Sequence, residues 1–209
     1  MNILIFGASG ATGLNLVSQA LRDGHTITAF VRDPTRLKIK HKNVRALKGN
    51  VLNYHRVDEA VANQDAVVSA LGASNPFKRD LNLIKGIQNI VAAMTSRNVR
   101  RFIYQSFIGV TENRDELGFL FKVVTPLILH SVISDHEEKE RIITTSGLDW
   151  TIVRCPLLTN GSFTGGYRDG ERIVSSAWFP RISRADVADF MLRQITETKY
   201  SLKKPRIMY

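Results

Sequence analysis

The residues best suited to chemistry lie near the start of the chain, where pairs of residues separate three glycines. The segment reads Gly7-Ala8-Ser9-Gly10-Ala11-Thr12-Gly13. Gly7 permits a tight turn, Gly10 lets anionic oxygens approach main-chain N–H groups, and Gly13 lets a following helix pack closely on a strand. A helix that begins here also presents the positive end of its dipole. The segment therefore predicts a binding site for the pyrophosphate of a dinucleotide.

Two arginines bear on which dinucleotide such a site accepts. Arg32 directly follows the apolar run Thr26–Val31, and Asp33 and Arg36 come next. NAD sites usually place Asp or Glu here to accept a hydrogen bond from the ribose 2′-hydroxyl. A guanidinium instead suits a phosphate, because its N–H donors form a fixed fork. Asp33 could serve NAD, but the surrounding cations favour a 2′-phosphate, so the predicted cofactor is NADP(H).

The net charge of +10 is concentrated in the first half of the chain, where residues 1–104 hold 15 Lys and Arg against 6 Asp and Glu. Much of this excess lies between Arg32 and Lys48. A solvated basic loop, an anionic small ligand or nucleic acid could each explain it. No recognised nucleic-acid motif accompanies the charge, so we expect a small-molecule ligand and no nucleic acid.

Alternating apolar runs and amphipathic segments must position these residues. The strands are expected at Asn2–Phe6, Thr26–Val31, Val44–Lys48, Ala66–Ala70, Arg101–Gln105 and Trp150–Arg154, and the helices at Leu14–Arg22, Tyr54–Val61, Asp80–Thr95, Ser134–Ser146 and Asp186–Gln194. This rhythm predicts an α/β fold: a Rossmann-like, doubly wound parallel sheet with helices on both faces. We expect one domain over residues 1–209. Residues 157–181 would form a small C-terminal lobe on the substrate side, with a hairpin around Gly165 and Gly166.

Several classes of protein are not expected. No signal peptide precedes the first strand, and the most apolar long stretch, Phe119–Ile133, is too short and too polar to span a membrane. That stretch would cover the pocket or form a contact. The single cysteine, Cys155, excludes an internal disulfide and suits the cytoplasm. No set of His, Cys and Asp has metal-ligand spacing. We expect a monomer or homodimer.

The Gly-x-x-Gly-x-x-Gly spacing resembles that of the atypical short-chain dehydrogenase/reductase superfamily. Further segments resemble its flavin reductase/biliverdin reductase B-like (NmrA-like) branch, over essentially the whole chain. They include Val31-Arg32-Asp33, Gly49-Asn50-Val51-Leu52, 65–72, 88–91, 146–151, 163–167 and 182–192.

This resemblance implies a set of cofactor contacts at the carboxyl ends of the strands. Asn50 and Val51 would lie beside the adenine, where the family commonly has Asp at position 50. Leu71 and Gly72 would border the ribose and pyrophosphate. The residues implied near the nicotinamide are Gln105, Ser106, Phe107, Cys155, Pro156 and Leu157.

The larger short-chain dehydrogenase family uses a Tyr-x-x-x-Lys pair as its acid. Here only Tyr200 and Lys204 fit that spacing. They follow the last predicted helix, so we interpret them as a coincidence. The catalytic candidates are therefore Ser106 and His136. Ser106 could contact the acceptor or the nicotinamide amide, or could simply cap the strand end. His136 matches a histidine of the family; it could meet an anionic acceptor or relay a proton, or could be exposed on a charged helix.

Without a Tyr-Lys pair, an acceptor that delocalises the added charge is favoured over a ketone. We therefore expect an NADPH-dependent oxidoreductase that transfers hydride to a flavin, quinone or related conjugated acceptor. Its pocket would lie between Leu71–Phe77, Ser106–Val110 and Leu157–Gly166. The alternative is a non-enzymatic NADP(H)-sensing regulator of NmrA-like type, a class with longer chains. A third possibility, an epimerase-like or steroid-directed reductase, would require a further proton donor.

Overall fold

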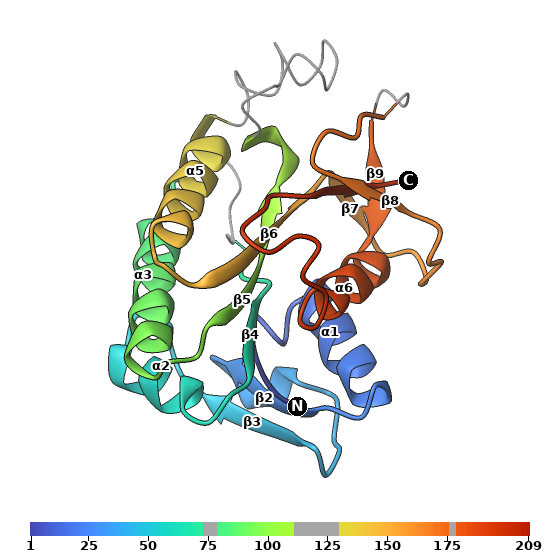
Figure 1. Ribbon diagram of the computed structural model, residues 1–209. Coiled ribbons are helices and arrows are strands. Elements are labelled where there is room, and N and C mark those ends of the chain that lie inside the picture. The colour runs from blue at the N-terminus through green and yellow to red at the C-terminus, as the bar shows by residue number, and fades with distance from the viewer. Residues whose placement is uncertain (73–78, 111–129, 176–178) are drawn as a thin grey trace.

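The computed structural model describes residues 1–72, 79–110, 130–175 and 179–209. An eight-stranded sheet in the order β3-β2-β1-β4-β5-β6-β10-β8 runs through it (Figure 1). The strands of the sheet are β1 Asn2–Phe6, β2 Thr26–Val31, β3 Val44–Lys48, β4 Ala66–Ser69, β5 Arg101–Phe107, β6 Asp149–Cys155, β8 Arg168–Gly170 and β10 Arg206–Met208. Every pairing is parallel except that of β10 with the edge strand β8.

Helices cover both faces of this sheet (Figure 1), which confirms the predicted fold class. The helices are α1 Ala11–Arg22, α2 Tyr54–Val61, α3 Leu81–Ser96, α5 His130–Thr144 and α6 Arg184–Arg193, with short 3₁₀ turns η1 at Pro34–Arg36 and η2 at Ile108–Val110. α1 and α6 pack on one face, while α2, α3 and α5 pack on the other. The alternating side chains of β1 enter both cores: Ile3 and Ile5 face α1, whereas Leu4 and Phe6 face α2 and α3.

The strand order indicates at which end of the strands a ligand would bind. β1 lies between β2 and β4, so the chain crosses in opposite directions on the two sides of β1. Connections that diverge in this way leave a crevice at the carboxyl ends of the strands. The carboxyl ends of β1, β2 and β4 therefore lead into the segments predicted to bind the cofactor.

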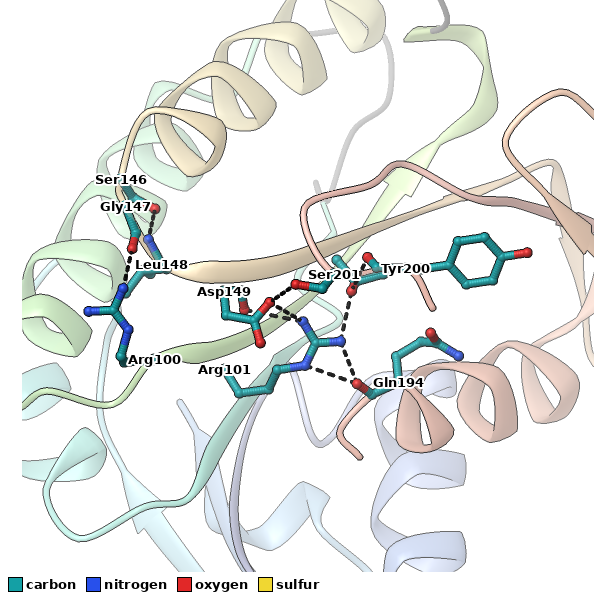
Figure 2. Close-up of polar contacts among 10 residues, drawn as sticks. Arg100, Arg101, Ser146, Gly147, Leu148, Asp149, Gln194, Tyr200 and Ser201 are labelled. Carbon is teal, nitrogen blue, oxygen red and sulfur yellow. Dashed lines mark hydrogen bonds and ion pairs between the residues drawn. The ribbon is translucent and has the colours of Figure 1, made fainter. Parts of the chain in front are cut away.

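A polar network lies at the opposite end of the strands, at the amino ends of β5 and β6 (Figure 2). Arg101, the first residue of β5, donates to Asp149 of β6 at 3.1 Å and from Nε to the Gln194 carbonyl at 2.9 Å. Ser201 also donates to Asp149. Arg101 thus fastens the end of α6 to the sheet, and Asp149 fastens the C-terminal segment, at the strand ends away from the glycine segment. Asp149 belongs to 146–151, one of the segments that resemble the family.

Residues 157–181 differ from the expected hairpin. β7 (Leu157–Thr159) pairs in parallel with β9 (Arg181–Ser183), and β8 joins the main sheet beside β10. Gly165 and Gly166 instead form an irregular segment. Asp186 holds this segment, because its carboxylate accepts from the N–H groups of Thr164 and Gly165, both at 2.9 Å. Asp186 therefore joins two of the segments that resemble the family, 163–167 and 182–192.

Candidate functional site

A cleft of about 350 Å³ opens at the carboxyl ends of β1, β2 and β4. Nine of the predicted cofactor residues line it: Gly7, Ser9, Gly10, Arg32, Arg36, Asn50, Val51, Leu71 and Gly72. The start of α3 also contributes, through Asp80, Asn82 and Leu83. A second, more open hollow adjoins the cleft; it shares Arg32 and Asn50 and adds the basic residues Lys48 and Arg56.

The glycine segment connects β1 to α1 as predicted. Gly7 has a positive φ of 77°, and a Cβ atom there would lie 2.7 Å from the Ala70 carbonyl oxygen. A Cβ atom on Gly13 would lie 2.0 Å from the Gly7 carbonyl oxygen, so only glycine lets α1 start this close to the loop. Gly10 is the N-cap residue of α1 and no side chain caps this end. The first-turn N–H groups therefore suit an anion, which fits a pyrophosphate. Ala8, Ala11, Thr12 and Gly13 do not line the cleft: Ala8, Thr12 and Gly13 are buried, whereas Ala11 is exposed.

The charged side chains that follow β2 leave arginines facing the cleft, which suits a phosphate. Arg32 and Arg36 are exposed and both line the cleft, whereas Asp33 does not. Asp33 caps η1: its Oδ1 accepts from the Thr35 N–H at 3.0 Å and from the Thr35 hydroxyl at 2.7 Å. These hydrogen bonds lower the pKa of Asp33 below its usual value. The carboxylate that could have served the ribose of NAD thus has a local structural role.

The loop after β3 presents Asn50 and Val51 to the same cleft. Asn50 Oδ1 accepts from the Leu52 N–H at 3.0 Å, which turns the chain and leaves the amide NH₂ group as the free polar end. From α3, Asn89 donates to the Val51 carbonyl at 2.8 Å. Asn89, which belongs to the family-like segment 88–91, therefore holds the main chain of this loop in place.

The residues predicted near the nicotinamide do not line the cleft. Ser106 is buried near the end of β5, and Gln105 and Phe107 are half-buried. Cys155 packs into the core on the α1 side, and burial raises the pKa of its thiol. A cofactor contact from Cys155 would thus use its main chain. Pro156 is buried and Leu157 is exposed, so the two residues differ in what they offer to a ligand.

Both catalytic candidates meet in one buried polar cluster. The Ser106 hydroxyl oxygen lies 2.6 Å from Glu140 Oε1 and 3.3 Å from His136 Nδ1. Glu140 pairs with Arg154, whose Nη2 lies 2.7 Å from Oε2 and whose Nε lies 3.2 Å from Oε1. Lys204 Nζ lies 3.5 Å from Oε2 of the same carboxylate. Because β5 and β6 pair in register, Ser106 lies opposite Arg154.

His136 is packed against β5 and is not a fully exposed residue of a charged helix. Its ring centre lies 6.4 Å from those of both Tyr104 and Phe107. Burial, with Lys139 as a nearby cation, lowers the pKa of His136 to about 3. The imidazole is therefore neutral at ordinary pH, which disfavours the predicted attraction to an anionic acceptor.

Sequence reasoning missed Glu140 and Arg154, and it named Lys204 only as part of the Tyr200–Lys204 spacing. The available signal was the spacing of His136 and Glu140, one helical turn apart on one face of α5. The Tyr200–Lys204 pair does not converge on a shared site: the Tyr200 hydroxyl donates to Asp169, while Lys204 reaches Glu140.

Two expectations fall outside the described residues. The structure does not describe residues 73–77 of the expected pocket wall or residues 119–129 of the apolar stretch. Over the described ranges, no cluster of three or more His, Cys, Asp or Glu side chains could hold a metal ion. Within the same ranges no helix has the length and apolar character needed to cross a membrane.

Curated proteins similar to this chain include enzymes and proteins without an assigned reaction. YwnB of Bacillus subtilis, an uncharacterized protein, is 26% identical over 208 residues, which cover 96% of this chain and 94% of that protein. The matched segments span only about a third of two other relatives. They cover 35% of the photosystem II assembly factor Ycf39 of Synechocystis (25% identity) and 31% of a 3-beta-hydroxysteroid dehydrogenase of Mycolicibacterium neoaurum (30% identity). They cover 54% and 49% of this chain, respectively.

Solved structures share the fold over almost the whole chain. A proposed epimerase from Bacteroides thetaiotaomicron superposes with a TM-score of 0.85 at 27% identity, covering 100% of this chain and 96% of that one. ChuY of Escherichia coli O157:H7, an anaerobilin reductase, superposes with a TM-score of 0.80 at 18% identity, covering 99% and 96%. A family model described as NAD(P)H-binding matches residues 7–198. The chain therefore belongs to the NAD(P)H-binding family and has a Rossmann-like fold.

Proposed function

We propose that this protein is an NADPH-dependent oxidoreductase that reduces a flavin, quinone or related conjugated acceptor. The observation that carries the choice of NADPH is the division of roles at the end of β2. Arg32 and Arg36 line the cleft, while Asp33 caps η1 and lies outside it. Two guanidinium groups suit the 2′-phosphate, and no carboxylate of β2 or η1 faces the cleft.

The chain's own groups would hold the cofactor in three places. The first turn of α1 would bind the pyrophosphate, the loop at Asn50 and Val51 would border the adenine, and the arginines would bind the phosphate on the ribose. NADPH would supply a hydride when bound. Ser106 and His136 would lie on the reaction side of the site and orient the acceptor.

The state of these two residues favours an acceptor that needs no strong protein acid. A ketone requires a proton donor or electrophile as negative charge develops on its oxygen. His136 is neutral at ordinary pH, and the Ser106 hydroxyl donates to Glu140. A flavin or quinone spreads the added charge over a conjugated ring and can take its proton from water. Alignment of the two reactants is then the main task of the protein.

Two measurements test the proposal. Calorimetry with NADPH and NADH measures the cofactor affinities, and loss of nicotinamide absorbance measures turnover with FMN, riboflavin and a simple quinone. We expect tighter binding of NADPH than of NADH, together with turnover of at least one acceptor. Absence of binding of either dinucleotide would overturn the cofactor assignment.

The rival is an NADP(H)-sensing regulator without turnover. One relative, Ycf39, is named for photosystem II assembly and not for a reaction. Tight NADPH binding with no turnover of any of the three acceptors would favour this second function over a reductase.

A further inference from the structure

The Ser106 hydroxyl has one proton and two neighbours able to accept it. Glu140 Oε1 lies at 2.6 Å and His136 Nδ1 at 3.3 Å. Glu140 is only 2% exposed, and Arg154 and Lys204 hold its second oxygen at 2.7 Å and 3.5 Å. Two cations therefore lie against this carboxylate. The shorter distance and the negative charge therefore both direct the Ser106 proton to Glu140.

The direction of the Ser106 hydrogen bond decides which ring nitrogen of His136 carries the proton. Once Ser106 donates to Glu140, its oxygen faces His136 Nδ1 with a lone pair. A second lone pair on Nδ1 would repel it at 3.3 Å, whereas an N–H group would donate to it. A neutral imidazole carries one N–H group, so a proton on Nδ1 leaves Nε2 without one. Nε2 forms no hydrogen bond within the described part of the chain.

We infer that Glu140 is a positioning residue that fixes the direction of the hydrogen bonds from His136 through Ser106 to itself. It thereby selects the Nδ1-protonated tautomer and makes Nε2 of His136 a hydrogen-bond acceptor. This inference deepens the proposed function, because it gives the reaction side of the site a preference for ligands with an N–H or O–H donor. An isoalloxazine ring has such an N–H group, whereas a simple quinone does not.

The surrounding groups are consistent with this arrangement. From β5, the Tyr104 hydroxyl lies on the same side of the sheet as Ser106 and has no hydrogen-bond partner within the described ranges. From α5, Asp135 accepts from the Asp80 N–H at 2.6 Å, and Lys139 is 3% exposed between Asp135 and Glu140 along the helix. Among the described residues, the only hydrogen bond of the His136 ring is therefore that to Ser106.

The tautomer can be measured on the free protein, independently of reductase activity. Long-range ¹H–¹⁵N correlation spectra of histidine-labelled protein at neutral pH distinguish the two tautomers, and His136→Gln identifies the signal. We expect the Nδ1-protonated form to predominate in the wild type. In Glu140→Gln the ratio of tautomers should fall roughly tenfold, the effect of losing one charge-assisted hydrogen bond.

Two further variants keep the test decisive. Ser106→Ala leaves the Glu140–Arg154 pair intact and removes the acceptor of the Nδ1 proton, so it should reduce the same ratio even if Glu140→Gln fails to fold. Glu138→Gln removes a half-buried carboxylate of α5 that pairs with Arg141; this variant is the matched control and should leave the ratio unchanged. A wild type with the proton on Nε2, or a ratio unaffected by Ser106→Ala, would overturn the inference whether or not the protein binds NADPH.

Discussion

Replacing Arg32 by alanine should weaken the binding of NADPH and leave that of NADH almost unchanged. Arg32 follows β2 directly and lines both the cleft and the adjoining basic hollow. If its guanidinium binds the 2′-phosphate, that contact exists only for NADPH. The ratio of the two dissociation constants therefore isolates the contribution of this side chain.

The magnitude follows from the exposure and charge of the site. Two unit charges 4 Å apart in water attract by about 1 kcal/mol, and a phosphate near its second ionisation carries almost two charges. Salt screening and the entropy of ordering an exposed arginine reduce this gain. A net loss of about 1.4 kcal/mol corresponds to a tenfold weaker NADPH complex. Arg36→Ala should act similarly, and Arg32→Glu should remove the preference for NADPH altogether.

Isothermal titration calorimetry with both dinucleotides measures this effect. Arg45→Ala is the matched control, because Arg45 is an exposed arginine of β3 that changes the net charge equally but lies outside both hollows. If Arg32→Ala weakens NADPH and NADH by the same factor, or if Arg45→Ala has the same effect as Arg32→Ala, the assignment of Arg32 to the 2′-phosphate is wrong.

Three further predictions concern stability and pH. Gly13→Ala should cost about 3 kcal/mol or more in denaturant unfolding, since a Cβ atom there would lie 2.0 Å from a main-chain oxygen; Gly24→Ala, with φ 79° and open space, should cost only about 1 kcal/mol. The hydrogen bonds that Asp186 accepts lower its pKa, so it stabilises the fold above the unfolded pKa, and this contribution is lost as the pH falls through the lower folded value. Asp186→Asn should therefore lower the unfolding free energy at pH 7 by about 2 kcal/mol and flatten its decline below about pH 4. The NMR signals of His136 should not titrate between pH 5 and 8, because its pKa is lowered to about 3; a midpoint near 6.5 would contradict the neutral ring.

Much of the sheet could be predicted from the sequence because strands such as β1 and β4 are short and almost wholly buried apolar runs. β3, in which only Leu47 is buried, is an exception. β1, β2, β3 and α2 have the predicted bounds. Helix starts were less predictable: α1 begins at Ala11 and not at Leu14, since its first turn belongs to the glycine segment and lacks an apolar repeat. β10 was missed because it is three residues long and contains Arg206, whose side chain is 2% exposed. From the sequence alone, an arginine such as Arg206 is expected at the surface, because its hydrogen-bond partners inside the fold cannot be foreseen.

The same reasoning explains which half of the candidate site was predictable. The cofactor side depends on local sequence: a turn, a helix N-terminus and the residues directly after one strand. The reaction side depends on contacts between distant segments, since Ser106 comes from β5, Glu140 from α5 and Arg154 from β6. Helical periodicity could place His136 and Glu140 on one face of α5, but not show that this face meets β5.

The buried pair of Glu140 and Arg154 is difficult to explain by stability alone. Removing two charges from water costs several kcal/mol per ion, and well-packed apolar residues of similar size often stabilise a fold as well or better. The pair nevertheless lies under Ser106, with Lys204 of the C-terminal segment as a third member. A hydrogen-bond acceptor there does what an apolar side chain cannot, because it gives the serine hydroxyl one direction. The position of the pair is thus better explained by the orientation of Ser106 and His136 than by any gain in folding free energy.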